Sequence, residues 1–257
     1  MARSTVTLVA PRAGPALSVL APVVAGISVL LGWELLAWSL DSRSLPAPSA
    51  LGPRLLTEWR EGGLAGYATT TMAEALLGCL IGFMVAVPLG YLIARSAAVS
   101  AALGPYVAAT QAIPAVALAP LLVLWIGYGL VPIALLCALL VFFPILINTT
   151  LGLTTLDPDV IDAARVDGAG RGRLLWHIEA PLALPSLLAG VRNGFVLSVT
   201  GAVVGEFVMG GQGLGMLLTV YRDRQDTAGL FAVLIALSVL AMTFFFAIRY
   251  LERRLRW

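Results

Sequence analysis

Side chains that could do enzymatic chemistry are few and isolated in this sequence. His177 is the only histidine, and Cys79 and Cys137 lie in apolar runs without a CxxC spacing. A catalytic triad needs a base beside its nucleophile, and a zinc site needs several histidine, cysteine or carboxylate ligands close together. The sequence therefore predicts no metal site, two buried free thiols, and a chain that is not an enzyme.

Lysine is absent, so all 16 basic residues are arginines. A phosphate-binding loop of the GxxxxGK[ST] type needs a lysine that reaches the phosphates of ATP. The sequence therefore predicts no ATP site of that type and no cofactor in this chain. If ATP drives its work, the ATP binds to another chain. The small net charge of +2 does not favour a nucleic-acid partner.

Two glutamates lie in apolar runs, where a charge is costly. Glu206 precedes the sequence GGQGLG, and Glu74 follows a run of threonines. An ionisable group near the bilayer centre costs about 2.5–3.5 kcal/mol on insertion scales, so such groups usually face a cavity or a partner. We expect Glu206 to point into a translocation path or to hydrogen-bond the glycine-rich sequence as an outer gate, and we favour the gate. Glu74 is a second path candidate, although a place in the first turn of a helix is the favoured explanation.

Three amides in apolar runs are further path candidates. Gln111, Asn148 and Asn193 could line a path, but amides in membrane helices commonly hydrogen-bond a neighbouring helix, and we favour that structural role. Gln111 is the best exception because Pro114 follows it and frees backbone carbonyls that a substrate could use. Arg192 could contact lipid phosphate or form an ion pair with Glu179, and we favour the lipid.

The elements that position these residues are predicted by composition. Hydrophobic residues make up 60% of the chain, charged residues 12%, and the mean hydropathy is +0.95. Soluble domains contain about 25% charged residues. A membrane helix needs about 20 mostly apolar residues. The sequence therefore predicts an all-α membrane protein with six transmembrane helices, at residues 16–40, 72–94, 103–126, 130–153, 185–208 and 229–250.

The distribution of arginine predicts the orientation of these spans. About twice as many arginines fall on the side of both chain ends as on the other side, which places both termini in the cytoplasm. We expect a short cytoplasmic segment at residues 1–15 and a single transmembrane domain at residues 16–257. A proline-rich outer connection at 41–71 includes a short amphipathic stretch at 55–59. Residues 209–228 are predicted to be an outer, mobile, glycine-rich connection.

One cytoplasmic segment, at residues 154–180, is charged rather than glycine-rich. Asp157 is a predicted N-cap with Pro158 at the first helical position. Asp167 and Gly168 interrupt the helix, and a second amphipathic stretch leads to Pro181. The segment is therefore predicted to form two helices joined by a turn. Small side chains let a foreign surface approach the backbone closely. The residues alone support docking to a partner and lying on the membrane surface about equally.

This segment resembles a known signature. Permease subunits of bacterial binding-protein-dependent ABC importers contain the pattern EAAxxxGAxxxxxxxxIxLP, and DAARVDGAGRGRLLWHIEAP follows it from Asp162 to Pro181. Asp162 replaces Glu, and Ala180 replaces Leu. The stretches QAIPAVALAPLLVLWIGYG, VFFPILINTTLGL, GAVVGEFVMGGQGLG and LERRLRW are similar to permeases for nitrate, taurine, alkyl sulfonates and thiamine-precursor or riboflavin-like compounds. The resemblance covers roughly residues 65–257.

The resemblance implies a type I ABC importer permease fold in the bacterial inner membrane. It implies a second permease copy, a cytoplasmic ABC ATPase dimer that binds ATP and magnesium, and an extracytoplasmic substrate-binding protein. The EAA-type coupling helix would contact the ATPase through Asp162, Ala163, Ala164, Gly168, Ala169, Ile178 and Pro181. The alternative is a secondary transporter or channel, for which we expect paired midplane charges and internal repeats. The substrate stays open, with a neutral or zwitterionic organic molecule slightly favoured over a bare anion.

Overall fold

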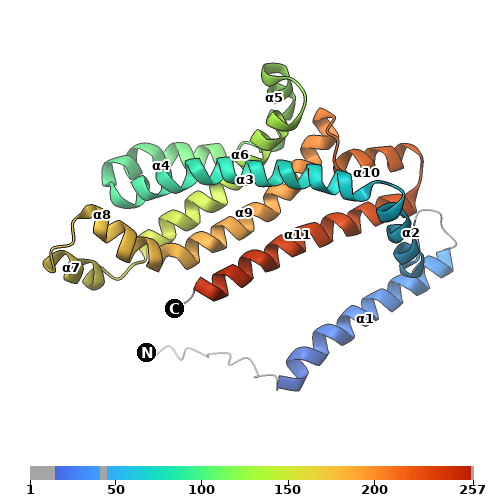
Figure 1. Cartoon of the computed structure of the whole chain (residues 1–257), viewed down its shortest axis with the longest axis horizontal. Helices are drawn as coiled ribbons and strands as arrows, with labels where there is room; N and C mark the ends of the chain where they lie inside the picture. Colours follow the sequence, from blue (N-terminus) through green and yellow to red (C-terminus); the bar gives the residue numbers. More distant parts are fainter. Residues whose placement is uncertain (1–14, 41–44, 256–257) are drawn as a thin grey trace, which may run out of the picture.

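The computed structural model describes residues 15–40 and 45–255, and this part of the chain is built from helices and short connections (Figure 1). The predicted N-terminal segment 1–15 lies outside the described residues, apart from Pro15. Within these ranges the all-α prediction is confirmed.

Five described helices are long and apolar enough to cross a membrane. Their bounds are α1 Pro15–Leu40, α3 Leu64–Arg95, α6 Leu130–Thr154, α9 Ala180–Met209 and α11 Thr227–Leu255. A sixth span follows if the bent pair of helices between α3 and α6 counts as one crossing. The described helices thus supply five spans, or six with the bent pair, in agreement with the predicted multi-span helical fold.

The third predicted span is bent rather than straight. Helix α4 (Ala97–Gln111) is separated by the 3-10 turn η1 (Ala115–Leu118) from α5 (Ala119–Ile126), and the two halves meet at 84°. Pro114 stands at the break. Proline lacks the backbone N–H that would continue the hydrogen-bond ladder, and it disfavours helical geometry at the preceding residue. The bend therefore follows from one residue inside an otherwise apolar run.

The core of the bundle is α6, which packs between α3 and α9. Small residues bring these helices close together: a Cβ at Gly90 of α3 would lie 2.9 Å from Thr149, and one at Gly201 of α9 would lie 2.7 Å from Leu140. Cys79 and Cys137 are free and buried, as predicted. Membrane helices without a solvent-driven hydrophobic effect rely on such close packing.

The two connections predicted to be outer contain more helix than the sequence predicts. Helix α2 (Pro48–Arg60) extends the predicted amphipathic stretch, and α3 begins at Leu64, within the segment predicted to be a connection. The connection predicted at 209–228 contains a helix that was not predicted, α10 (Leu214–Asp223). One side of α10, including Leu217, Leu218 and Tyr221, is buried against the bundle. This apolar side holds the segment in place.

The two ends of the bundle differ in character (Figure 1). Helices α2 and α10 lie at one end. At the opposite end are α7 (Pro158–Val166), α8 (Arg171–Leu174) and the π-helical turn η2 (Leu175–Glu179), which continues into α9. Helix α11 ends on the same side as α7. The predicted helix, turn, helix thus protrudes from the end to which α11 leads.

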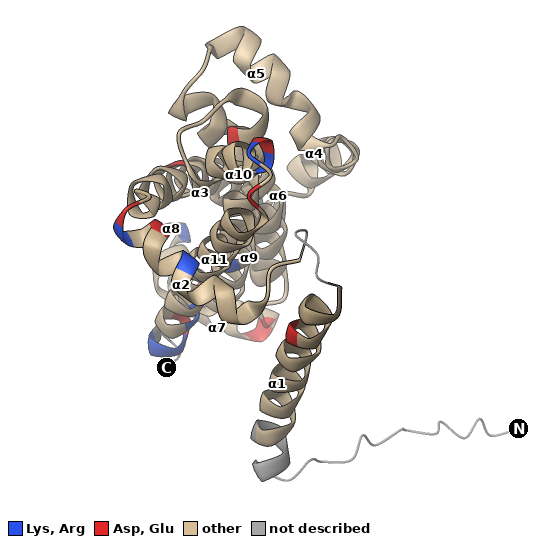
Figure 2. Cartoon of the chain, turned by 90° about the vertical axis from the view of Figure 1, so that its right-hand side faces the viewer, with Lys and Arg blue, Asp and Glu red and all other residues tan. Residues whose placement is uncertain are grey.

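Helix α1 stands apart from the bundle (Figure 2). Ser49 of α2 donates hydrogen bonds from its hydroxyl and backbone N–H to Glu34 at 2.7 and 3.1 Å, and Trp33 contacts Phe231 with ring centroids 5.6 Å apart. Glu34 thus anchors the start of α2. Most described side chains of α1 are exposed.

Candidate functional site

The protruding helix α7 presents an uncovered face. The Asp157 carboxylate accepts a hydrogen bond from the N–H of Asp159 at 2.9 Å, which caps the helix as predicted. Only Ile161 of α7 is buried, and Val166 is 88% exposed. Ala163 is also exposed, so small side chains border an apolar surface that no described residue covers.

Gly168 ends this helix through its backbone conformation. Its φ is +81°, a value that favours glycine, and a Cβ there would meet nothing within 4 Å. The N–H of Gly168 donates to the carbonyl of Arg165, and the N–H of Ala169 donates to that of Ala164, both at 3.0 Å. This pair of bonds is a Schellman motif. The predicted turn at this glycine is present.

The base of the protrusion is tied to the bundle. Ile178 lies in η2, and Pro181 lies in the first turn of α9, where its missing N–H leaves a carbonyl of the preceding turn without its usual donor. Glu179 is buried and pairs with Arg95 at the end of α3, at 2.8 Å. Movement of the protrusion would therefore reach both α9 and α3.

Arg192 forms an ion pair with a carboxylate that the sequence analysis did not predict. Its guanidinium contacts Glu252 of α11 at 2.9 Å. The ion pair with Glu179, the alternative to the favoured lipid contact, is not formed, because Glu179 faces α3 and Arg192 faces α11. Two separate ion pairs thus join neighbouring helices near the same end of the bundle.

The Glu206 carboxylate hydrogen-bonds to the backbone of the glycine-rich connection. Its side chain is 2% exposed and accepts hydrogen bonds from the Thr71 hydroxyl at 2.6 Å and from the N–H of Gly215. The Thr71 oxygen in turn accepts the N–H of Leu214 at 2.8 Å. The predicted hydrogen bond between Glu206 and the glycine-rich sequence is therefore present.

The glycines of GGQGLG allow this close contact. A Cβ at Gly211 would lie 2.5 Å from Glu206, one at Gly215 would lie 2.6 Å from the Val203 carbonyl, and one at Gly213 would overlap both Glu206 and Thr71. Any side chain larger than hydrogen at these three positions would push the connection away from the carboxylate. Glycine suits these positions because the backbone passes close to the buried Glu206 side chain.

Glu74 lies beside Glu206 instead of in a first helical turn. Helix α3 begins at Leu64, so Glu74 is well inside it, and the favoured explanation from the helix dipole is wrong. The Glu74 carboxyl is 2% exposed and hydrogen-bonds to the Glu206 carboxyl. One of its oxygens, Oε2, has no partner among the described residues. Two acids from α3 and α9 thus meet in the core.

The three amides fall into two groups. Asn148 donates to the Pro144 carbonyl at 2.8 Å, and a Cβ at Gly190 would lie 2.7 Å from it, so Asn148 packs between α6 and α9. Asn193 is exposed on α9. Gln111 is exposed at the end of α4, beside the bend, with a long contact of 3.4 Å to Val107. Of the three amides, only Asn193 and Gln111 are exposed in this chain.

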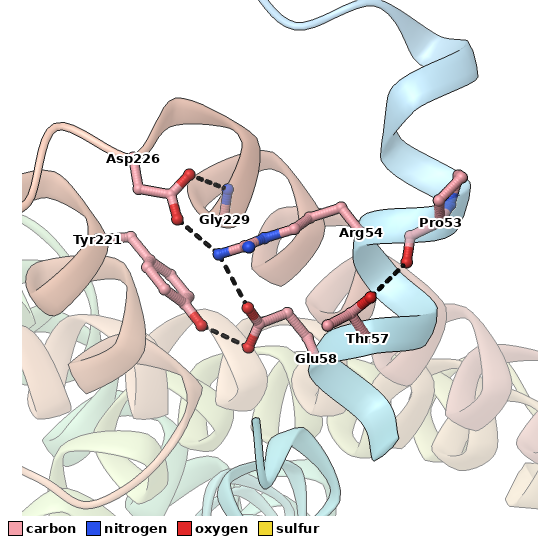
Figure 3. Close-up of polar contacts among 7 residues, drawn as sticks. All are labelled: Pro53, Arg54, Thr57, Glu58, Tyr221, Asp226 and Gly229. Atoms are coloured by element: carbon pink, nitrogen blue, oxygen red, sulfur yellow. Dashed lines mark hydrogen bonds and ion pairs between the residues drawn. The ribbon is translucent and has the colours of Figure 1, made fainter. Parts of the chain in front are cut away.

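A polar cluster at the end of the bundle that holds α2 and α10 was not predicted (Figure 3). Arg54 of α2 contacts Glu58 at 2.9 Å and Asp226, before α11, at 2.5 Å. The hydroxyl of Tyr221 donates to Glu58. Burial and the neighbouring Glu58 raise the pKa of Tyr221 to about 12. The i, i+4 spacing of Arg54 and Glu58 could have predicted their ion pair. Their other partners, Asp226 and Tyr221, lie far away in the sequence.

Known proteins resemble this chain along most of its length. Residues 86–257 match the family described as binding-protein-dependent transport system inner membrane component. The riboflavin transport system permease protein RibX of Chloroflexus aurantiacus is 41% identical over 214 residues, 83% of this chain and 80% of that protein. The formylaminopyrimidine transport permease protein ThiX of Halalkalibacterium halodurans is 31% identical over 234 residues, 91% of this chain and 93% of that protein.

Solved structures agree with the fold. A chain of the inward-facing MetNI methionine ABC transporter superposes with a TM-score of 0.70 at 20% identity, covering 78% of this chain and 99% of that chain. The bundle thus has the type I ABC importer permease fold, and an uncoupled transporter or channel is not favoured. The predicted family is confirmed: this chain is a multi-span membrane subunit that belongs to the inner-membrane permease components of binding-protein-dependent ABC transport systems.

Proposed function

We propose that two copies of this chain form the translocation path of an importer that a cytoplasmic ABC ATPase dimer drives and an external binding protein supplies. The uncovered face of α7, held on a base tied to two helices of the bundle, carries this proposal. Both chain ends and α7 would lie in the cytoplasm of a bacterial cell. ATP and magnesium would bind to the partner ATPase and not to this chain.

Helix α7 would enter a groove on the ATPase. Its exposed Ala163 and Val166 suit close packing, while the pair of Asp162 and Arg165, at 2.9 Å, offers polar contacts at the rim. Closure of the ATPase dimer would move α7. The ion pair of Arg95 and Glu179 supports transmission to α3, and the continuous chain through η2 supports transmission to α9.

The path would lie against the exposed face of α9. Asn193 and Thr200 are seven residues apart and therefore share one face of the helix, and both are exposed. Gln111, beside the bend of α4 and α5, would supply a second polar group. These are uncharged hydrogen-bonding side chains, which favours a neutral or zwitterionic organic solute over a bare anion.

The substrate class would be a flat heteroaromatic compound of the vitamin or vitamin-precursor kind. Two relatives are named for riboflavin and formylaminopyrimidine, both heteroaromatic. Other relatives are named for aliphatic sulfonates and taurine, at 31% and 28% identity. Uptake of labelled riboflavin by cells with the complete transporter tests this. Competition by a pyrimidine but not by taurine is expected, and competition by taurine alone would contradict the substrate class.

The outer gate would be the glycine-rich connection held by Glu206 and Glu74. In the structure, the carboxylate of Glu206 accepts a hydrogen bond from the N–H of Gly215, and Thr71, which donates to Glu206, accepts one from the N–H of Leu214. Release of these bonds would free the connection to move when the path opens outward. The buried position of the two acids supports a latch more than direct contact with the solute.

Substitution on α7 tests the coupling proposal. Ala163→Glu places a long charged side chain on the exposed face without straining the helix, so we expect loss of ATPase co-purification and loss of uptake. Gly52→Glu is the control, because Gly52 is exposed on α2 at the opposite end and a Cβ there meets nothing within 4 Å. Retained assembly and uptake in Ala163→Glu would overturn the assignment.

A further inference from the structure

A basic cavity lies between α9 and the last turns of α11, and no residue of α7 lines it. It has a volume of about 510 Å³ and is lined by Arg192, Phe245, Arg249, Glu252 and Arg253. Three of these five side chains are cationic and one is anionic, so the cavity has an excess of positive charge. Basic residues gather at the end of α11 in Figure 2.

The position of the cavity along α11 matches the headgroup layer of a membrane. A helix of 29 residues is about 43 Å long at 1.5 Å per residue, whereas the hydrocarbon core is about 30 Å thick. The last turns, which contain Arg249 and Arg253, therefore extend past the hydrocarbon. Phosphate groups of lipids occupy that depth.

The arginines of the cavity retain unused hydrogen-bonding capacity. Arg192 is held by Glu252 at 2.9 Å and lies over the Phe245 ring at 5.0 Å, but its Nε is buried and has no partner within the described residues. Arg249 and Arg253 are exposed and make no hydrogen bond or ion pair with other described residues. Arginine binds phosphate through two parallel N–H donors.

We propose that this cavity binds the phosphate of an anionic phospholipid headgroup. Arg249 and Arg253 would donate to the phosphate oxygens from α11, with the fixed guanidinium of Arg192 on the α9 side. Phe245 would form the apolar wall that the glycerol and upper acyl carbons contact. Glu252 would orient Arg192 and prevent the three cations from repelling one another. The lipid would thereby join the ends of α9 and α11.

Lipid retention by the full-length chain tests this assignment. The protein is placed in nanodiscs of equal parts phosphatidylcholine and phosphatidylglycerol, extracted with mild detergent, and the retained lipids are measured by native mass spectrometry. We expect phosphatidylglycerol to be enriched on the wild-type chain. Arg249→Gln and Arg253→Gln should each lower that enrichment about fivefold, as removal of one arginine near an anionic surface does.

Arg254→Gln is the matched control. Arg254 is adjacent in sequence and has the same charge, but it donates to the Tyr250 hydroxyl at 2.6 Å and does not line the cavity. We expect this variant to keep the wild-type enrichment. An equal loss in Arg253→Gln and Arg254→Gln would overturn the site, because it would show attraction by net charge alone.

A second arm distinguishes lipid from a soluble anion. Inorganic phosphate at millimolar concentration is added before extraction. Unchanged phosphatidylglycerol enrichment is expected, because the headgroup is held at the membrane by its acyl chains. Displacement by inorganic phosphate would overturn the lipid assignment and identify a soluble-anion site, and absence of any enrichment on the wild-type chain would overturn the proposal outright.

Discussion

The carboxyl of Glu74 on α3 hydrogen-bonds to the carboxyl of Glu206 on α9, and each side chain is 2% exposed. A hydrogen bond between two carboxyl groups requires a proton on one of them. Glu206 accepts hydrogen bonds from Thr71 and Gly215, whereas Oε2 of Glu74 has no partner among the described residues. The two acids are therefore not equivalent.

This asymmetry predicts different effects of the two amide substitutions. Glu74→Gln keeps a donor for Glu206, so uptake and thermal stability in detergent should stay near wild type. Glu206→Gln removes an acceptor from the glycine-rich connection, which should lower the free energy of unfolding by about 1–3 kcal/mol and reduce uptake. Unfolding followed by tryptophan fluorescence measures both variants. Equal effects, or a larger effect of Glu74→Gln, would contradict the unequal roles of the two acids.

The glycine-rich connection should not tolerate a methyl group at its centre. Gly213→Ala would place a Cβ on top of Glu206 and Thr71, which should destabilise the protein by about 1–3 kcal/mol and loosen the connection. Gly104→Ala, in α4, is the control, because its Cβ would meet nothing within 4 Å. Limited proteolysis near α10 should accelerate in Gly213→Ala only, and protection equal to wild type would show that the connection does not depend on Glu206.

Substitution of Asn148 should affect stability, whereas substitution of Asn193 should affect uptake. Asn148→Leu removes a hydrogen bond at a tight α6–α9 contact, so it should lower the melting temperature. Asn193→Leu is on an exposed face and should leave the melting temperature unchanged while reducing uptake severalfold. A melting curve and a transport assay on each variant test this. Normal uptake by Asn193→Leu would remove Asn193 from the path.

The polar cluster around Arg54 and Tyr221 predicts that the free energy of unfolding falls at high pH. Tyr221 has its pKa raised from 10.0 to about 12, chiefly by burial and then by Glu58. In the folded state the proton is held more tightly than in the unfolded state, so stability is full below about pH 10 and falls as the pH rises toward 12. The difference in melting temperature between wild type and Tyr221→Phe should shrink over that interval. A constant difference would show that the hydroxyl does not titrate with folding.

Local signals in the sequence predicted the protruding helix and turn well. Asp157 and Pro158 start α7, and Gly168 ends it, because capping and a positive φ depend on residues close in sequence. Long apolar runs likewise predicted the crossings. Hydropathy could not predict the 84° bend, although Pro114 was its cause.

Relationships between helices could not be predicted in the same way. The partner of Arg192 depends on which face of α9 meets α11, and the place of Glu74 depends on α3 beginning at Leu64. Both require the rotation of one helix against another, which periodicity does not specify. The cluster around Arg54 joins residues that are 172 positions apart, and no short-range pattern predicts such a pair.

Helix α1 has few internal ties: the hydrogen bonds of Glu34 with Ser49 and the ring contact of Trp33 with Phe231. Its loss would expose little of the packed core, since the buried apolar clusters lie in the helices that follow. We therefore expect a chain truncated before Pro48 to keep both buried clusters.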